Sequence, residues 1–507
     1  MKSNKRQIAQ NTLMLYFRML FTMVVSLYSS RILLKELGVI DFGIYNVVGG
    51  VVIMFLFLNS SMAASTSRFI AFELGKGNYE QLNKVFSISV VNHLAIVFVV
   101  FILAETVGMW FLYAKLVIPP ERISAALWVY QFSIFSSMLS LMQSPFNALI
   151  IAHERIGIYA WGNITDSILK LLIVVLLGYI EYDKLKLYGM MVFVAVAIML
   201  LFNIIACRIL FSYCKFKFYR DIQAYKTMLA YSGWDLFGNF STIAQGQGLN
   251  MLLNIFFGPA VNAARGVSYQ VQGAVNQFGV NLMTAIRPQI IKLYAVGEKK
   301  EMINLVFLGA RYSFFLLWLF TLPILLQTEY ILSLWLKSVP ENSVIFIQLI
   351  LFIGLINSWE TPFIIAMHAT GKIKIPNIIC GTLLIMVLPV SYLFLKLGFA
   401  ASSVFVVFLC IVFVNLWIEW FLIHRLVGFS LKDAIRQVLA KSVAVMLLSG
   451  ILPFLLNQMA FYNNFIRFSV VVSVSFLSVL ITIYFVGIKK EERDYIKLKI
   501  KDKICYG

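Results

Sequence analysis

Repeated apolar stretches long enough to cross a bilayer are the feature that most limits what this chain can fold into. An α-helix needs about 20 predominantly apolar residues to span the hydrocarbon core. Fourteen such stretches lie between charged or Pro/Gly breaks, near 11–34, 42–66, 85–112, 124–151, 158–180, 188–212, 227–256, 266–290, 303–327, 343–368, 376–396, 399–423, 437–457 and 465–487. The sequence therefore predicts an all-α polytopic membrane protein with about 14 transmembrane helices.

The composition excludes several soluble classes. Hydrophobic residues make up 61% of the chain and charged residues only 13%, whereas soluble proteins carry about 25% charged residues. So few charges cannot cover a soluble surface, which rules out a soluble enzyme, a nucleic-acid binder and a disordered scaffold. The five cysteines have no C-x-x-C or Cys/His spacing, so neither disulfides nor a zinc site are expected. No cofactor or metal is predicted.

The basic residues predict the orientation. Of the 42 Lys and Arg residues, 29 fall on the side of the N-terminus, 10 on the opposite side and three within spans. Cytosolic connections are enriched in Lys and Arg, so both termini are expected in the cytosol. Most of the net charge of +19 then reflects topology, with attraction to anionic membrane lipids as a secondary effect.

The sequence contains an internal duplication. The segments Ser144-Pro145-Phe146 and Thr361-Pro362-Phe363 are each followed, ten residues after the proline, by a basic residue and isoleucine. Gly38 and Arg68 have counterparts in Gly258 and Arg287, and the offsets between the copies run from 217 to 221 residues. Six spans separate the copies, so we expect a six-helix lobe at 1–215, a pseudo-symmetric second lobe at 216–430, and two further helices with a basic cytosolic tail at 431–507. By analogy, such duplicated bundles suggest an alternating-access transporter.

Polar residues form stripes on the spans. At 100° per residue, Asp235, Asn239, Thr242, Gly246 and Asn250 fall within an arc of about 80° on the seventh span. Amides on the eighth span form a second stripe, made by Gln270, Gln277 and Asn281. Such stripes must face partner helices or a water-filled cavity. The favoured interpretation is a cavity. Amide side chains such as those of Asn239, Asn250, Gln270, Gln277 and Asn281 suit a sugar ligand there, because they both donate and accept hydrogen bonds.

Arginines within or beside the spans predict an anion pathway. Arg18 lies about two turns inside the first span, where an unpaired cation is expensive. Arg68 and Arg287 mark equivalent ends of the second and eighth spans, and Arg31 and Arg265 lie near the opposite ends. Together they form a basic track suited to phosphate. The alternatives are topology signals for Arg68 and Arg287, and snorkelling to the interface for Arg31 and Arg265.

Acidic residues in the spans are candidates for ion coupling. Asp235 and Glu360 have no oppositely charged partner in their own helix, so each pairs with a cavity arginine or carries a coupling H⁺ or Na⁺. Asp166 and Lys170 are expected to neutralise each other, and Glu419 gives no indication of function. No P-loop occurs, so this chain is not expected to hydrolyse ATP itself.

The sequence resembles a transporter family. Two six-span lobes with two extra spans, Leu37-Gly38-x-x-Asp41-x-Gly43-x-Tyr45 after the first span, and Gly75-Lys76-Gly77-Asn78 after the second are similar to the polysaccharide transporter family. This family is the O-antigen and capsule repeat-unit flippase branch of the multidrug/oligosaccharidyl-lipid/polysaccharide exporter superfamily. Related lipid flippases carry cavity arginines on the first, second and eighth spans, which correspond to Arg18, Arg68 and Arg287.

The resemblance implies a function. Members transfer undecaprenyl-pyrophosphate-linked oligosaccharide from the cytosolic to the outer leaflet of a bacterial inner membrane, by alternating access and without ATP. Expected partners are the lipid-linked oligosaccharide, membrane lipids, and the polysaccharide polymerase and glycosyltransferases of the pathway, but no nucleic acid. A cation-coupled multidrug exporter of the same superfamily remains the first alternative, and a membrane polysaccharide polymerase the second.

Overall fold

The computed structural model describes residues 2–55, 57–115, 119–257, 259–335, 339–459, 462–488 and 492–493. Regular structure within these residues is entirely helical, with no strand among them. Ten of the described helical segments are long and apolar enough to cross a membrane. The remaining four predicted spans coincide with α1, α2, α8 and α9, so the prediction of an all-α polytopic membrane protein is confirmed.

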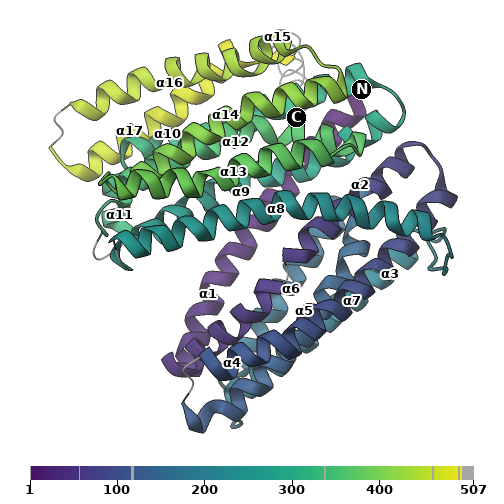
Figure 1. Cartoon of the computed structure of the whole chain (residues 1–507). Helices are drawn as coiled ribbons and strands as arrows, with labels where there is room; N and C mark the ends of the chain where they lie inside the picture. The colour runs from purple at the N-terminus through teal and green to yellow at the C-terminus, as the bar shows by residue number, and fades with distance from the viewer. Residues whose placement is uncertain are drawn as a thin grey trace, which may run out of the picture. The chain divides into compact units, whose positions relative to one another are not determined.

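The helices follow one another with short connections (Figure 1). In chain order they are α1 (Lys2–Phe55), α2 (Phe57–Gly75), α3 (Tyr79–Leu103), α4 (Met109–Lys115), α5 (Ile123–Ala152), α6 (Ile156–Leu176), α7 (Lys184–Leu210), α8 (Ile222–Phe257), α9 (Pro259–Ala295), α10 (Lys299–Leu326), α11 (Thr328–Trp335), α12 (Ser343–Thr370), α13 (Lys374–Lys396), α14 (Ser403–Val427), α15 (Leu431–Ala434), α16 (Ala440–Gln458) and α17 (Asn464–Thr482). Three short π-helical segments adjoin these helices. The segment at 104–108 continues α3, the one at 435–439 precedes α16, and the one at 483–487 continues α17.

The first long helix is interrupted at one residue. Gly38 has φ +73° and ψ 172° inside α1, a left-handed conformation that glycine adopts without steric cost. Two helical segments therefore meet at Gly38. The connection predicted between the first two spans is reduced to this single residue.

Backbone conformations recur between the two halves of the sequence. Gly77 after α2 has φ +69°, and Gly297 after α9, 220 residues later, has φ +83°. Glu154 after α5 has φ +60°, and Gly371 after α12, 217 residues later, has φ +76°. The offsets match those of the sequence motifs, so the two copies also share their turns.

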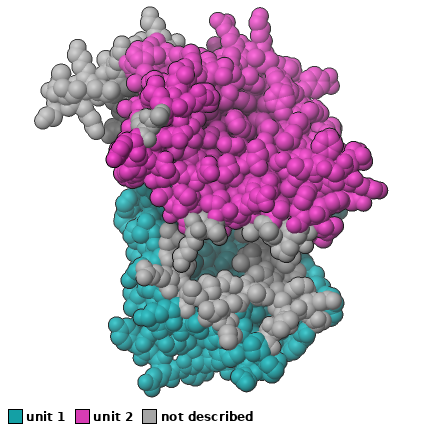
Figure 2. Space-filling model, turned by 90° about the vertical axis from the view of Figure 1, so that its left-hand side faces the viewer, with its two compact units in different colours: residues 1–239, 291–297 teal, residues 240–290, 298–507 magenta. Residues whose placement is uncertain are grey.

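The chain forms two compact units, coloured separately in Figure 2. Unit 1 comprises Met1–Asn239 and Ile291–Gly297, and unit 2 comprises Phe240–Ile290 and Glu298–Gly507. Both α8 and α9 are shared between the units. The predicted lobes at 1–215 and 216–430 describe the repeat in the sequence, and as folding units they stay a prediction.

Unit 1 is built around α5. This helix packs against α1, α2, α3 and α7, and α1 also packs against α6. Tyr130 and Ile134 of α5 are fully buried, and the Tyr130 hydroxyl donates to the carbonyl of Ala104 over 2.6 Å. We call the end where α2 and α5 finish the basic end, because Lys76, Lys84 and Arg155 lie there.

Unit 2 is a bundle to which the last two long helices belong. Its α12 packs against α10 and α14, while α16 and α17 pack against each other and against α10. Trp318 Nε1 donates to Ser449 Oγ over 2.9 Å, which joins α10 to α16. A Cβ atom on Gly487 would lie 2.8 Å from the Phe315 ring. The two appended helices are therefore closely packed parts of this unit.

Candidate functional site

The polar stripe of α8 begins with a buried carboxylate. Asp235 is only 7% exposed, and Asn239 Nδ2 donates to its Oδ2 over 3.1 Å. The two residues are one helical turn apart and lie in unit 1. The structure thus brings a predicted coupling residue into direct contact with a predicted glycan-binding amide.

Arg265 joins the polar faces of α8 and α9 in unit 2. Its Nη1 donates to Asn250 Oδ1 over 3.3 Å and its Nη2 to the carbonyl of Gly246 over 2.6 Å. The guanidinium carbon lies 4.1 Å from the centre of the Tyr269 ring. Arg265 has no carboxylate in ion-pair distance within the described residues. Its positive charge is therefore held by neutral oxygens and an aromatic face.

The amides of α9 are partly used inside the protein. Gln277 Nε2 donates to Asn281 Oδ1 over 3.4 Å, and Asn281 is 1% exposed. Gln272, which was not predicted, donates to the carbonyl of Ile350 over 3.1 Å. Gln270 is exposed. Of the α9 amides predicted to bind a glycan, Gln270 is the most accessible and Asn281 the least.

Two predicted arginines of unit 1 lie against aromatic rings. The Arg18 guanidinium carbon is 5.5 Å from the centre of the Tyr159 ring. Arg68 is 9% exposed, and its guanidinium carbon lies 4.4 Å from the Phe69 ring centre and 5.4 Å from that of Tyr231. Cation–π contacts of this kind stabilise a desolvated arginine. The surroundings of Arg68 fit a packing role at least as well as an open anion site.

The remaining two predicted arginines are Arg287 and Arg31. Arg287 is half-buried near the end of α9, one residue before Pro288, with no ion pair inside the described ranges. Arg31 belongs to α1, but its side chain is outside the described part of the structure.

A carboxyl cluster in unit 2 was only half predicted. Glu360 on α12 is 6% exposed, Glu419 on α14 is 4% exposed, and the two interact electrostatically. Asn415, one turn before Glu419, hydrogen-bonds to Glu360. Sequence reasoning identified Glu360 but assigned nothing to Glu419. The available signal was the spacing of Asn415 and Glu419, which puts an amide and a carboxyl on one face of a helix.

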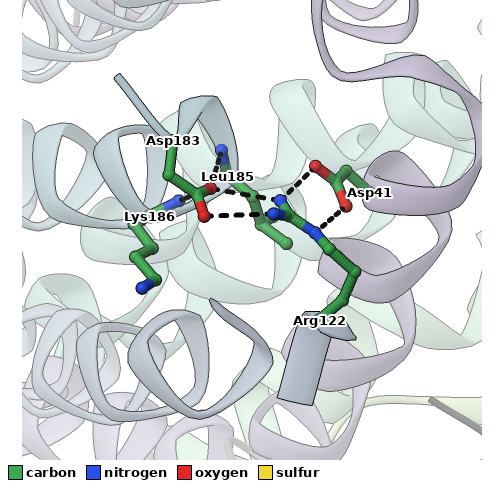
Figure 3. Close-up of polar contacts among 5 residues, drawn as sticks. All are labelled: Asp41, Arg122, Asp183, Leu185 and Lys186. Carbon is green, nitrogen blue, oxygen red and sulfur yellow. Dashed lines mark hydrogen bonds and ion pairs between the residues drawn. The ribbon is translucent and has the colours of Figure 1, made fainter. Parts of the chain in front are cut away.

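An ionic network ties helix ends of unit 1 together at the end opposite the basic end (Figure 3). Arg122 donates from Nε to Asp41 Oδ1 over 2.8 Å and also from Nη2 to the other oxygen of Asp41. Its Nη1 and Nη2 each reach an oxygen of Asp183 over 3.1 Å. Lys184 Nζ pairs with Glu36 Oε2 over 2.8 Å. Glu36 and Asp41 are thus parts of a structural charge cluster.

Asp183 gives this network a defined pH dependence. Burial raises the pKa of Asp183, but hydrogen bonds from Arg122 and from the backbone N–H of Lys186 outweigh it, so the pKa lies below its usual range. A depressed folded-state pKa contributes stability that is complete above the unfolded value of about 3.9 and is lost as pH falls through the folded value.

We expect Asp183→Asn to lower the thermal midpoint at pH 7 by an amount corresponding to about 1 kcal/mol, because the pair is partly solvated. As the pH falls below the depressed folded-state pKa of Asp183, the thermal midpoints of mutant and parent should converge, since the parent carboxylate becomes protonated there. Thermal unfolding of detergent-solubilised protein across this pH range measures the difference. An equal difference at both pH values would contradict this role of the carboxylate.

Comparisons with known proteins agree with the fold. No family model and no curated protein matches the sequence. Among solved structures, an outward-facing multidrug resistance MATE family transporter of the MOP superfamily matches with TM-score 0.72 at 13% identity, covering 84% of this chain and 96% of that one. A MATE protein in its straight conformation gives TM-score 0.73 at 12% identity over the same shares. A MOP superfamily transporter from Pyrococcus furiosus, described as having a binding pocket of reverse polarity that suggests a different function, gives TM-score 0.69 at 12% identity, covering 83% and 96%. The chain therefore has a MATE-like fold.

Proposed function

We propose that the protein is a flippase that moves an undecaprenyl-pyrophosphate-linked oligosaccharide from the cytosolic to the outer leaflet of a bacterial inner membrane. The MATE-like fold supports a membrane transporter. The choice of an anionic glycolipid rests on the chemistry of the polar helix faces and on the sequence resemblance. Both termini would be cytosolic, and the polymerase and glycosyltransferases of the pathway would be its partners.

The observation that carries this proposal is the environment of Arg265. A guanidinium held by Asn250 and a backbone carbonyl keeps its charge available to an anion, because no carboxylate neutralises it among the described residues. Guanidinium N–H groups match phosphate oxygens in a bidentate geometry. Neighbouring amides both donate and accept hydrogen bonds, as sugar hydroxyls require.

In this proposal the other predicted residues complete the pathway. Arg18, Arg68, Arg287 and Arg31 would extend the basic track for the pyrophosphate. Asn239, Gln270, Gln277 and Asn281 would join Asn250 in contacting the glycan. Asp235 and Glu360 would couple transport to H⁺ or Na⁺, with Glu419 as a second carboxyl beside Glu360.

A cation-coupled multidrug exporter is the second candidate, and the buried carboxyl groups favour it. Asp235, Glu360 and Glu419 are each less than 9% exposed, and carboxylates attract cationic compounds. Two of the solved structures of similar fold are MATE proteins, one of them described as a multidrug resistance transporter. The two candidates differ in what the loss of a positively charged side chain beside the substrate should do. It should weaken transport of an anionic lipid, but it should not weaken transport of a cationic drug.

We expect Arg265→Ala to slow flipping of a pyrophosphate-linked lipid by about 10- to 100-fold, comparable to the loss of one charge-assisted hydrogen-bonded pair. The flipping rate of Arg265→Lys should lie between those of the parent and Arg265→Ala, because lysine keeps the positive charge but cannot form the bidentate hydrogen bonds of a guanidinium group. The measurement is the rate at which labelled undecaprenyl-pyrophosphate-linked sugar reaches the opposite leaflet of proteoliposomes.

Arg467→Ala is the matched control. Arg467 also donates to a neutral acceptor, the carbonyl of Asn457, but it lies on α17, outside the two polar stripes. Unchanged flipping in Arg265→Ala, together with altered export of a cationic dye, would move the assignment to the multidrug exporter. In cells, deletion of the gene should leave lipid-linked glycan protected from a membrane-impermeant oxidant.

A further inference from the structure

Glu154 occupies a backbone conformation that suits glycine. Its φ of +60° places it in the left-handed region, and the equivalent residue of the second repeat is Gly371, with φ +76°. A residue with a Cβ atom is strained in this region. Glycine would make the same turn without strain, so the glutamate side chain must contribute something that offsets the strain.

The side chain of Glu154 reaches a helix of the second repeat. Its Oε1 accepts from Lys292 Nζ over 2.5 Å, and the Glu154 side chain is only 9% exposed. The carbonyl of Glu154 also accepts from Asn11 Nδ2 over 3.5 Å. The turn between α5 and α6 thus binds the last turns of α9 as well as α1, all within unit 1.

The end of α2 touches the same part of α9 at backbone level. A Cβ atom on Gly75 would lie 2.8 Å from Lys292 Cα and 2.9 Å from Ala295 Cβ, so only glycine fits there without displacement. The Phe72 and Tyr294 rings lie 6.5 Å apart between centres. The two helix ends are therefore in direct contact beside the ion pair.

The same helix α2 also contacts the first part of α8. Ser65 Oγ donates to the carbonyl of Met228 over 3.4 Å, and the Phe69 and Tyr231 ring centres are 5.6 Å apart. Ser65 is 1% exposed. Segments of the first six spans and of the second six are therefore sealed against each other near the basic end of unit 1.

We propose that Glu154 and Lys292 form a latch that keeps α2 and α5 closed against α8 and α9 at the basic end. Neither partner of the ion pair belongs to the polar stripes, and one partner, Glu154, has a strained backbone. The pair therefore acts on the closed contact between the helices and not on the transported molecule. This inference rests on the alternating-access part of the proposed function, but it does not depend on which substrate is carried. Breaking the pair should raise the population that is open at this end.

The accessibility of residue 65 tests the latch directly. Ser65→Cys, in a full chain whose five native cysteines are replaced, puts a thiol in the sealed contact between α2 and α8. A membrane-impermeant maleimide added on the side of the basic end of vesicle-reconstituted protein reports opening as the labelling rate. No substrate is needed, so failure of this test and failure of the flippase assay are distinguishable.

We expect Glu154→Gln and Lys292→Gln each to raise the labelling rate about five- to tenfold, as loss of a mostly buried ion pair shifts a two-state equilibrium. The charge-swapped double variant, Glu154→Lys with Lys292→Glu, should return it towards the parent value. Asp166→Asn is the matched control. It breaks the Lys170–Asp166 pair at 2.6 Å within α6 and should leave labelling unchanged.

Glu154→Gly separates a latch from a purely structural residue. It removes the carboxylate and also relieves the left-handed strain, so it should raise labelling as Glu154→Gln does, while its thermal midpoint lies above that of Glu154→Gln. Parental labelling in Glu154→Gly and both glutamine variants would overturn the proposal. Raised labelling that the charge swap fails to reverse would overturn the assignment to the ion pair.

Discussion

Glu492→Gln is expected to destabilise the protein by about 3–5 kcal/mol, the typical cost of removing one partner of a buried ion pair. Arg311 lies in the middle of α10, is 2% exposed and donates from Nη2 to Glu492 Oε1 over 2.6 Å. The glutamine amide cannot neutralise the guanidinium, so a buried cation would stay without its counter-charge. The midpoint of thermal unfolding in detergent should fall strongly, with the α16–α17 part of unit 2 affected first.

The double variant Arg311→Met with Glu492→Gln tests the cause. It removes the cation as well as the anion, and an apolar side chain of similar length fills the site, so most of the lost stability should return. Lys170→Gln, which breaks a half-exposed pair, should cost less than about 1 kcal/mol. A Glu492→Gln protein as stable as the Lys170→Gln control would show that the buried pair does not stabilise unit 2.

Glu360→Gln is expected to reduce transport driven by a pH gradient by about 10- to 100-fold, the usual range of coupling between two ligands of one protein. Glu360 and Glu419 are buried inside unit 2 and interact electrostatically, and Asn415 of α14 hydrogen-bonds to Glu360. Two carboxyl groups in such a dry place are not both charged, because the repulsion and desolvation would be too costly. The pair is therefore suited to take up and release one proton.

The measurement is substrate movement in proteoliposomes with and without an imposed pH gradient. Glu360→Gln and Glu419→Gln should each lose the gradient-dependent component while the slow movement without a gradient persists. Glu341→Gln changes an exposed carboxylate outside the helices and should behave like the parent. Full gradient dependence in Glu360→Gln would exclude the cluster as the coupling site and leave Asp235 as the candidate.

The fold was accessible from the sequence because apolar length alone determines membrane-spanning helices. Each of the fourteen predicted stretches coincides with helix, and the duplication reappears as paired turns at Gly77 and Gly297. The division into compact units could not be predicted from the sequence. It depends on how α8 and α9, whose residues belong to both units, pack against the rest of the chain, and no local pattern marks residues 239 and 291.

For the candidate site, the sequence predicted only which polar residues share a face of one helix. Helix periodicity placed Asp235 with Asn239 and, on the same stripe, Asn250. It could not show that Arg265 reaches Asn250 from another helix, because periodicity carries no information about neighbours. For the same reason Glu419 was passed over, and the aromatic surroundings of Arg68 were unexpected, since Tyr231 is far from it in the sequence.

Unit 1 has a consequence for how the protein is made, because it is discontinuous in the chain. Residues 291–297 complete it, and residues 240–290 belong to the other unit. At roughly 5–20 residues per second of synthesis, the ribosome needs about 3–10 seconds to add these 51 intervening residues. During that time the surfaces of α2 and α5 that contact Lys292 and Ala295 stay uncovered, because the end of α9 has not yet been synthesised. The nascent first half is thus a binding-competent intermediate, and it is the stage at which a chaperone or insertase of the membrane would find its surface uncovered.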